Sequence, residues 1–158
     1  MKNFDDMPGH LARRFQQIAV AIFHAEMSEA GFDLTPVQFA ALSAIEANPG
    51  IDQATLAGLI AYDRTTIGGV VDRLVQKDLA ERNASSRDRR ARVLNITGKG
   101  HSTLEKIDTA VDAAQRKLLR GLSEDEGRTL MRLLRKAVES GNDLSRAPQR
   151  SAQIENRL

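Results

Sequence analysis

Apolar residues return along most of the chain at the spacing of α-helices. Between about residues 9 and 30 they recur at steps of three and four positions, at Leu11, Phe15, Ile18, Ile22 and Ala25. The same spacing, with capping residues and glycine or proline at the ends, predicts further helices over about 36–46, 53–60, 64–77, 102–120 and 123–139. Strand-like patterns are confined to about 80–83 and 91–97, which predicts one β-hairpin with a loop at its tip.

The order of these elements indicates the fold. The helices at 53–60 and 64–77 are short and separated by a tight turn, which is the helix-turn-helix signature. A domain of this kind with its hairpin needs only residues 35–100, so the amphipathic helices within 1–34 and 101–143 have apolar seams without a partner inside it. We therefore predict a mainly α fold, a winged helix-turn-helix flanked by N- and C-terminal dimerisation helices. Residues 144–158 are polar and are expected to form a flexible tail.

The composition excludes several classes of protein. None of the 158 residues is cysteine, so disulfide scaffolds, cysteine zinc sites and thiol chemistry are ruled out. No apolar run is long enough to cross a membrane, and residues 1–8 lack the apolar core of a signal peptide, so a cytoplasmic protein is expected. The three histidines are far apart and no phosphate-cradling glycine loop is present. We therefore predict no catalytic residue, metal site or cofactor, and no enzyme.

Positive charge is concentrated in one short segment. The formal net charge is +2, from 23 basic and 21 acidic residues. Between residues 82 and 92, five arginines and one aspartate give +4, which leaves −2 for the rest of the chain. Arginine presents several donors in one plane, which suits phosphates, and it enters a narrow minor groove readily. The alternative is a solvated basic loop, but its place directly after a helix-turn-helix favours nucleic acid.

The second helix of the pair presents small groups when its apolar stripe faces inward. Its outward face and flanks, at about 100° per residue, carry Thr65, Thr66, Gly68, Gly69, Asp72, Arg73 and Gln76. Two glycines within a helix are unfavourable by about 1 kcal/mol each relative to alanine. Either they allow the backbone to enter a DNA groove, which we prefer, or they allow close packing against a neighbouring helix.

Four motifs along the chain carry a family resemblance. In order they are Leu34-Thr35-Pro36-x-Gln38-Phe39, Asp52-Gln53-Ala54-x-Leu56-Ala57, Asp63-Arg64-Thr65-Thr66 with Val70-Val71-Asp72-Arg73-Leu74, and Asp88-Arg89-Arg90-Ala91 with Leu94-x-Ile96-Thr97 and Gly100. Together they resemble the multiple-antibiotic-resistance regulator (MarR) family of winged helix-turn-helix repressors, with Ile96 in place of the usual leucine. The match covers nearly the whole chain in the family's order.

The resemblance implies DNA contacts for one set of residues. These are Gln38, Arg64, Thr65, Thr66, Gly68, Gly69, Arg73, Arg87, Asp88, Arg89 and Arg90. Arg90 corresponds to the wing arginine that enters the minor groove, and Asp88 to the acid that orients the wing through ion pairing. Residues 64–69 fall where the family reads the major groove, and Gln38 and Arg73 at contacts to the DNA backbone. The implied partners are a second copy of the chain, as a homodimer, and a palindromic operator in double-stranded DNA.

Members of this family often release DNA when a small aromatic acid or phenol binds between the DNA-binding lobe and the dimerisation helices. A small aromatic or heteroaromatic acid is therefore the expected effector. The candidate residues are His10, Arg14, Phe15, Phe39 and Tyr62. Arg14 would hold the carboxylate and the aromatic residues would form apolar walls. The alternatives are an ordinary interhelix ion pair for Arg14 and a plain surface position for His10.

Two functions remain open on the sequence. The predicted one is a homodimeric DNA-binding regulator, most simply a repressor, although activation is not excluded. The alternative is a helical adaptor that uses the winged-helix surface to bind another protein. An adaptor would not need five arginines around the hairpin tip.

Overall fold

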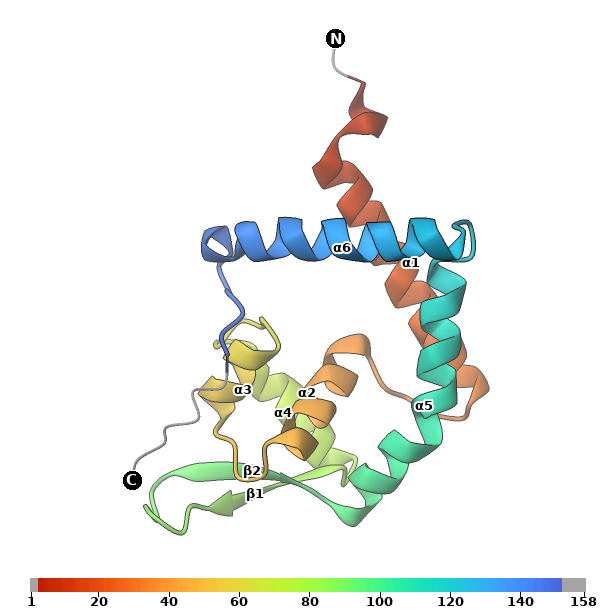
Figure 1. The fold of residues 1–158 in the computed structure, drawn as a ribbon. Coiled ribbons are helices and arrows are strands. Elements are labelled where there is room, and N and C mark those ends of the chain that lie inside the picture. Colours follow the sequence, from red (N-terminus) through yellow and green to blue (C-terminus); the bar gives the residue numbers. More distant parts are fainter. Residues whose placement is uncertain (1–2, 152–158) are drawn as a thin grey trace.

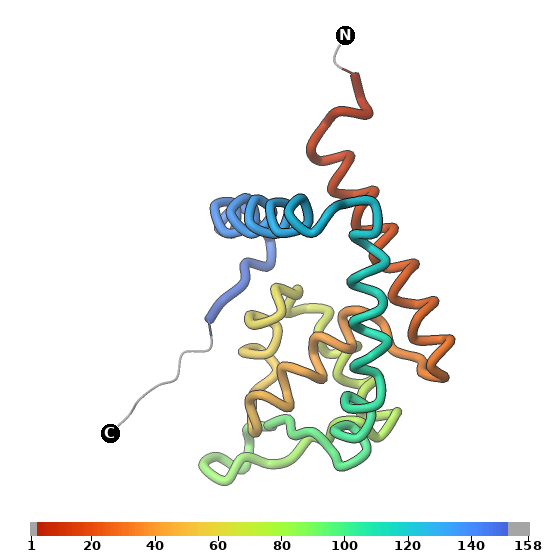
Figure 2. Tube along the Cα trace, turned by 45° about the vertical axis from the view of Figure 1, so that its right-hand side comes forward, coloured from red at the N-terminus to blue at the C-terminus, as the bar shows by residue number. Residues whose placement is uncertain are grey.

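The computed structural model describes residues 3–151 (Figures 1 and 2). Its helices and strands are, in chain order, α1 (Pro8–Glu29), α2 (Pro36–Ala47), α3 (Gln53–Leu59), α4 (Ile67–Gln76), β1 (Ala80–Ala84), β2 (Arg92–Ile96), α5 (Gly98–Leu118) and α6 (Glu124–Ser140). Short 3-10 turns precede α1 at Phe4–Asp6 and follow α6 at Asn142–Leu144. The predicted mainly helical fold with a β-hairpin is confirmed. Within the described residues, no helix is both long and apolar enough to cross a lipid bilayer.

The molecule has two regions that are joined by α5. The first, at the bottom of Figure 1, consists of α2, α3, α4 and the hairpin, and we call it the helix-turn-helix lobe (residues 35–97). From the hairpin α5 rises beside α1, and the two helices lie side by side in both views. α6 then runs across the upper part of the molecule in Figure 1, apart from the lobe, and the N-terminal part of α1 extends above it. The lobe and the outer helices are therefore distinct surfaces on one chain.

Side-chain caps predicted from the sequence determine where several helices begin. The Thr35 hydroxyl accepts a hydrogen bond from the backbone N–H of Gln38 at 3.2 Å, and the Gln38 amide oxygen accepts one from the N–H of Thr35 at 3.3 Å. This reciprocal arrangement is a capping box, and Ser123 and Glu126 form another at the start of α6. Asp52 caps α3. The predicted caps are thus confirmed at these three helices.

The lobe has an apolar core shared by its helices and its hairpin. Buried side chains from all of these elements meet there, including Leu42, Ile45, Leu56, Ile67, Val71, Leu74 and Leu94. Ile51 forms an isolated antiparallel bridge with Leu94, in which the N–H of Leu94 donates to the Ile51 carbonyl at 2.8 Å. The bridge ties the segment before α3 to β2. The helix-turn-helix and the hairpin are consequently one packed unit.

α5 begins at a close backbone contact with the lobe, which we call the α5 joint (residues 78, 79, 97 and 100). The Thr97 hydroxyl accepts a hydrogen bond from the N–H of Gly100 at 2.9 Å and donates one to the Asp78 carbonyl at 2.7 Å. The N–H of Thr97 donates to the Leu79 carbonyl at 3.1 Å. A Cβ at Gly100 would lie 2.1 Å from that same Leu79 oxygen. Only glycine allows the backbones to approach so closely.

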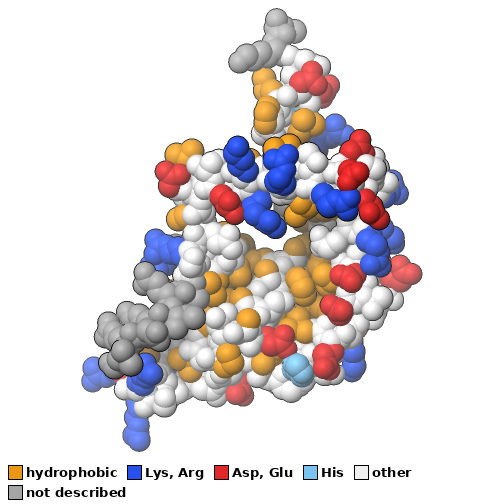
Figure 3. Space-filling view, viewed as in Figure 1, with side chains coloured by type: hydrophobic (Ala, Val, Ile, Leu, Met, Phe, Trp, Pro, Cys, Tyr) orange, Lys and Arg blue, Asp and Glu red, His pale blue; other side chains and the backbone are white. Residues whose placement is uncertain are grey.

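Two apolar faces remain uncovered within a single chain. In the N-terminal half of α1, Leu11 and Ile18 are 50% and 48% exposed, whereas Phe23 and Met27 further along are buried. On α6 the only buried residue is Gly127. The exposed apolar residues of α6 are Met131, Leu133, Leu134 and Val138. Figure 3 shows apolar side chains gathered in the hollow beneath α6.

The chain beyond α6, predicted to be a flexible tail, makes contacts with the lobe. The Gln149 side-chain amide donates to the Leu59 carbonyl at 3.0 Å, and the N–H of Arg150 donates to the Gly58 carbonyl at 2.8 Å. Both acceptors lie at the end of α3, where helix carbonyls lack partners within the helix. The structure thus gives residues 144–151 defined contacts with α3, whereas the flexibility of the tail stays a prediction; residues 152–158 lie outside the described residues.

Replacing the glycine of the α5 joint tests how much the fold depends on it. We expect Gly100→Ala to lower the free energy of unfolding by about 3 kcal/mol, because the opposing atom is a backbone oxygen that cannot turn away. Gly98→Ala is the matched control, since a Cβ there meets nothing within 4 Å. Urea unfolding measures both. Equal stability of the two variants would show that the joint is not tightly packed.

Candidate nucleic-acid interface

One carboxylate organises the connection between α3 and α4. Asp63 Oδ1 accepts hydrogen bonds from the hydroxyl and the backbone N–H of Thr65, both at 2.7 Å, and these bonds lower the pKa of the Asp63 carboxyl. The N–H groups of Thr66 and Ile67 donate to the Asp63 carbonyl at 3.1 and 3.0 Å. Residues 64–66 are consequently a turn, so the predicted helix start at Arg64 is wrong. Arg64 and Thr65 lie exposed beside the N-terminal end of α4.

α4 buries one face and exposes the other, as its spacing predicts. The buried residues are Ile67, Val70, Val71 and Leu74. The exposed residues on the other side are Gly69, Asp72, Arg73 and Gln76. Arg73 Nη1 donates to Gln76 Oε1 at 3.2 Å, so the Arg73 side chain lies along the outer surface of the helix. This outer surface contains no large apolar group.

The glycine pair of α4 has free space around it. A Cβ at Gly69 would meet nothing within 4 Å, and one at Gly68 would lie 3.4 Å from Gln53 Nε2, which is an ordinary van der Waals distance. Packing within the chain therefore requires neither glycine. Of the two explanations that the sequence left open, the one based on a helix neighbour in the same chain has no support here.

The hairpin tip is an exposed loop held by short-range hydrogen bonds. The N–H of Ser85 donates to the Ala91 carbonyl at 2.9 Å, and Asp88 Oδ1 accepts from the N–H of Arg90 at 2.9 Å. The side chains of residues 87–90 are exposed. Among residues 3–151 no ion pair involves Asp88. Its expected action through ion pairing is thus corrected: Asp88 shapes the tip through a backbone hydrogen bond.

A different ion pair connects the hairpin to α4. Arg82 Nη2, on β1, lies 2.5 Å from Asp72 Oδ1, on the outer face of α4. The pair places the hairpin against that face, and it partly neutralises the +4 of the arginine segment. No sequence signal identified it, because the two residues lie on different elements whose angle depends on the intervening turn. Arg82 and Asp72 therefore pair with each other and position the hairpin on α4.

Gln38, which is expected to contact the DNA backbone, makes its hydrogen bonds within the protein in this structure. Gln38 is 9% exposed. Its amide oxygen accepts from the Thr35 N–H in the capping box and from Lys77 Nζ at 3.3 Å. Lys77 in turn pairs with Asp33 at 3.0 Å. The Gln38 side-chain amide thus forms its hydrogen bonds within the protein.

The five residues predicted for an effector do not converge within one chain. Arg14 and Phe15 line an apolar concavity between α1 and α6, which is also lined by Pro8, Leu11, Ala12, Ile18, Leu130 and Leu134. His10 lies one turn earlier, where its ring packs on Phe4 with centroids 4.0 Å apart. Burial and the nearby Arg13 and Arg14 lower the pKa of His10.

The two aromatic residues of the lobe lie elsewhere. The Phe39 ring is 5.8 Å from the Phe23 ring of α1, and Tyr62 packs against the lobe core. Phe39 also borders a second concavity, between α2 and α5, that the sequence did not predict. The remaining lining residues of this second concavity are Ser43, Glu46, His101, Leu104, Glu105 and Asp108.

This second concavity is acidic. His101 Nδ1 lies 2.5 Å from Glu46 Oε1, and its Nε2 lies 3.5 Å from Glu105 Oε1. The hydrogen bond to Glu46 and the charges of both carboxylates raise the pKa of His101. With Asp108 as a third carboxylate, this site repels an acid, so the concavity at Arg14 is the better of the two for a carboxylate. In the part of the chain that the structure describes, no cluster of His, Cys, Asp or Glu could hold a metal ion.

A helix-turn-helix with an open outer face, flanked by an arginine-tipped hairpin, defines a winged-helix DNA-binding protein. The comparisons with known proteins agree. A model of the MarR family matches residues 32–91. The transcriptional repressor NicR of Pseudomonas putida is 30% identical over 132 residues, which cover 84% of this chain and 82% of NicR. The chain belongs to the MarR family of transcriptional regulators.

Solved structures extend the similarity beyond the lobe. A probable transcriptional regulator from Pseudomonas aeruginosa matches with a TM-score of 0.80 at 33% identity, over 85% of this chain and 99% of that one. BpsR of Bordetella bronchiseptica, whose DNA binding is regulated by 6-hydroxynicotinic acid, matches with a TM-score of 0.80 at 27% identity, over 88% of this chain and 98% of that one. The α1, α5 and α6 arms therefore belong to the shared fold.

The free space at Gly69 leads to a prediction with two opposite effects. Gly69→Ala should raise the free energy of unfolding by about 0.5–1 kcal/mol, because alanine restricts the unfolded chain and meets no clash. The same methyl group should weaken duplex DNA binding several-fold if the backbone of α4 enters a groove. Denaturant unfolding and duplex titration at one salt concentration measure the two effects. A variant that is stabilised but binds DNA as tightly as the wild type would place Gly69 outside the interface. The control is Gly121→Ala, whose Cβ also meets nothing within 4 Å and which should leave DNA binding unchanged.

Proposed function

We propose that this protein is a homodimeric repressor that binds a palindromic site in duplex DNA and is released by a small aromatic or heteroaromatic acid. One observation carries the proposal: the Arg82–Asp72 ion pair holds the arginine tip beside the open face of α4. Small side chains on α4 suit base edges in the major groove, and exposed arginines suit phosphates and the minor groove. In this arrangement α4 would enter the major groove while the arginines of the hairpin tip reach the minor groove of the same duplex.

The exposed apolar faces of α1 and α6 support a second copy of the same chain as the partner. The apolar residues on α6 are between 39% and 57% exposed, although they line one stripe of an amphipathic helix. Such a face is stable in water only when it is covered. A two-fold dimer would cover it and would also present two α4 helices to two half-sites, which a palindromic operator requires.

The first test removes the wing arginine. We expect Arg90→Ala to weaken duplex binding at least tenfold and to reduce the slope of log affinity against log salt by about 2, since each lost phosphate contact contributes about 0.9 and a dimer loses two. Arg120→Ala is the control, because this exposed arginine lies at the far end of α5. Fluorescence anisotropy from 50 to 300 mM salt, about the range where such slopes are measured, also gives the number of chains per duplex. Unchanged binding by Arg90→Ala, or one chain per palindrome, would contradict the proposal.

The effector test uses the concavity between α1 and α6. Support comes from the regulation of BpsR by 6-hydroxynicotinic acid and from the position of Arg14 beside an apolar wall. Aromatic and heteroaromatic acids, 6-hydroxynicotinic acid among them, should raise the melting temperature of the wild type. Arg14→Ala should abolish this rise, because it removes the cation that faces the carboxylate.

Arg13→Ala is the matched control for the effector test. Arg13 precedes Arg14 on the same helix, but its guanidinium donates to Gln17 Oε1 at 2.9 Å. The acid should still stabilise this variant. If no acid raises the melting temperature, or if both variants respond equally, Arg14 does not hold an effector.

A further inference from the structure

The chain that follows α6 returns to the lobe as a defined strap, which we call the C-terminal strap (residues 142–151). Asn142 and Gln149 close its upper part through two hydrogen bonds: Asn142 Nδ2 donates to the Gln149 carbonyl at 2.9 Å, and the N–H of Gln149 donates to Asn142 Oδ1 at 2.8 Å. Further bonds from Gln149 and Arg150 reach the last carbonyls of α3. The strap is thus held by the side chains of Asn142 and Gln149 and by one backbone hydrogen bond from Arg150, and none of these bonds uses the Arg150 guanidinium.

Gly58 is the residue that lets the strap approach α3. A Cβ at this position would lie 3.3 Å from the Arg150 Cβ and 3.5 Å from its Cδ. The first distance is tighter than most Cβ contacts, and the second is an ordinary van der Waals contact. The aliphatic part of Arg150 therefore packs directly against α3 at Gly58.

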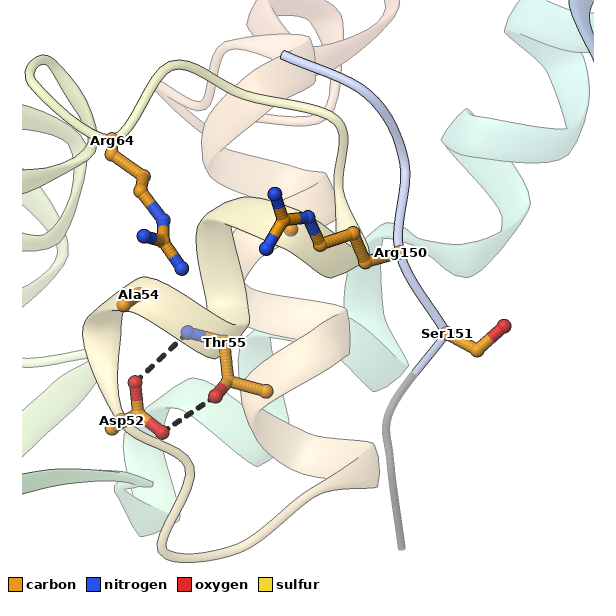
Figure 4. Close-up of a pocket in the computed structure, with 7 residues that line it drawn as sticks. Asp52, Ala54, Thr55, Arg64, Arg150 and Ser151 are labelled. Carbon is orange, nitrogen blue, oxygen red and sulfur yellow. Dashed lines mark hydrogen bonds between the residues drawn. The ribbon is translucent and has the colours of Figure 1, made fainter. Parts of the chain in front are cut away.

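The strap brings Arg150 to the same concavity as Arg64. The lining residues come from α3, from the turn before α4 and from the strap: Asp52, Ala54, Thr55, Gly58, Arg64, Arg150 and Ser151. Figure 4 shows the guanidinium groups of Arg64 and Arg150 extending into this concavity from its two sides. Both residues are exposed, and within residues 3–151 neither forms an ion pair.

The charges of this concavity favour an anion. Its single carboxylate, Asp52, is already engaged, because Oδ1 accepts from the Thr55 N–H at 2.9 Å and Oδ2 accepts from the Thr55 hydroxyl at 2.6 Å. The two guanidinium groups repel each other unless a negative group lies between them. Arg150 is nevertheless held here by a main-chain hydrogen bond to the Gly58 carbonyl, which does not involve its charge.

The location of the concavity identifies the anion. Arg64 immediately precedes Thr65 and Thr66, at the end of α4 that would enter the major groove, so the nearest polyanion in a complex is the backbone that borders that groove. We infer that the C-terminal strap is part of the DNA interface and that Arg150, together with Arg64, grips a phosphodiester of the operator. Arginine suits this task because its planar donors pair with two phosphate oxygens at once. The inference rests on the proposed function and adds to it a contact from outside the winged helix.

The experiment compares single and double variants of the full-length chain. Arg150→Ala should weaken duplex binding roughly tenfold at moderate salt, equally for operator and unrelated sequences, and should lower the salt slope by about 2 for a dimer. Arg150→Lys, which keeps the charge, should retain most of the slope. Because both arginines grip one phosphate, the combined loss in Arg64→Ala/Arg150→Ala should be smaller than the product of the separate losses.

The controls separate this inference from the function on which it rests. Arg120→Ala removes the same charge far from the lobe and should bind as the wild type does, and thermal melting verifies that every variant is folded. If the wild type binds duplex DNA and loses affinity with Arg90→Ala, but Arg150→Ala binds with unchanged affinity and slope, the strap has no part in the interface and the regulator remains. If the wild type does not bind duplex DNA, both proposals fail.

Discussion

The close contact between Gly100 and the Leu79 carbonyl is the constraint on which the rest of the structure depends. It sits where three parts of the chain meet: the end of α4, the start of the hairpin and the first turn of α5. The Thr97 hydroxyl, bonded to both the Asp78 carbonyl and the Gly100 N–H, locks the same point. Since α5 continues to α6 and packs beside α1, the direction in which it leaves the joint orients the outer helices relative to α4. In a dimer, that direction would determine the separation of the two α4 helices.

Electrostatics in this protein acts locally. The formal net charge of +2 is small. The hairpin tip is nevertheless an exposed arginine-rich surface, and the concavity between α2 and α5 is acidic. The Arg82–Asp72 pair uses one of the hairpin's arginines to position the others. Exposed ion pairs contribute little to stability, so this pair matters chiefly for geometry. The same division appears at Arg150, where one main-chain hydrogen bond holds the residue without using its charged group.

Local sequence patterns predicted the elements well, and their failures have physical causes. The caps at Thr35, Asp52 and Ser123 were predictable because capping is decided within four residues of the chain. The start of α4 was missed because Asp63 gathers the N–H groups of residues 65–67 into a turn, which apolar spacing does not reveal. The cap formed by Gln38 follows from its capping-box spacing to Thr35, whereas its burial depends on the packing of α2 against other elements.

The sequence by itself determined the order of the helices, the inward face of α4 and the accumulation of arginine around the hairpin tip. These features depend on periodicity and composition, which are properties of neighbouring residues. Only the tertiary structure decided that Arg82 pairs with Asp72, that Arg14 and Phe39 line different concavities, and that Arg150 lies beside Arg64. Each of these joins residues on separate elements, and their distance depends on turn geometry and helix packing that no single segment encodes. The concentration of arginine in one segment therefore indicated the kind of partner, whereas the fold determined which charged side chains remain exposed to meet it.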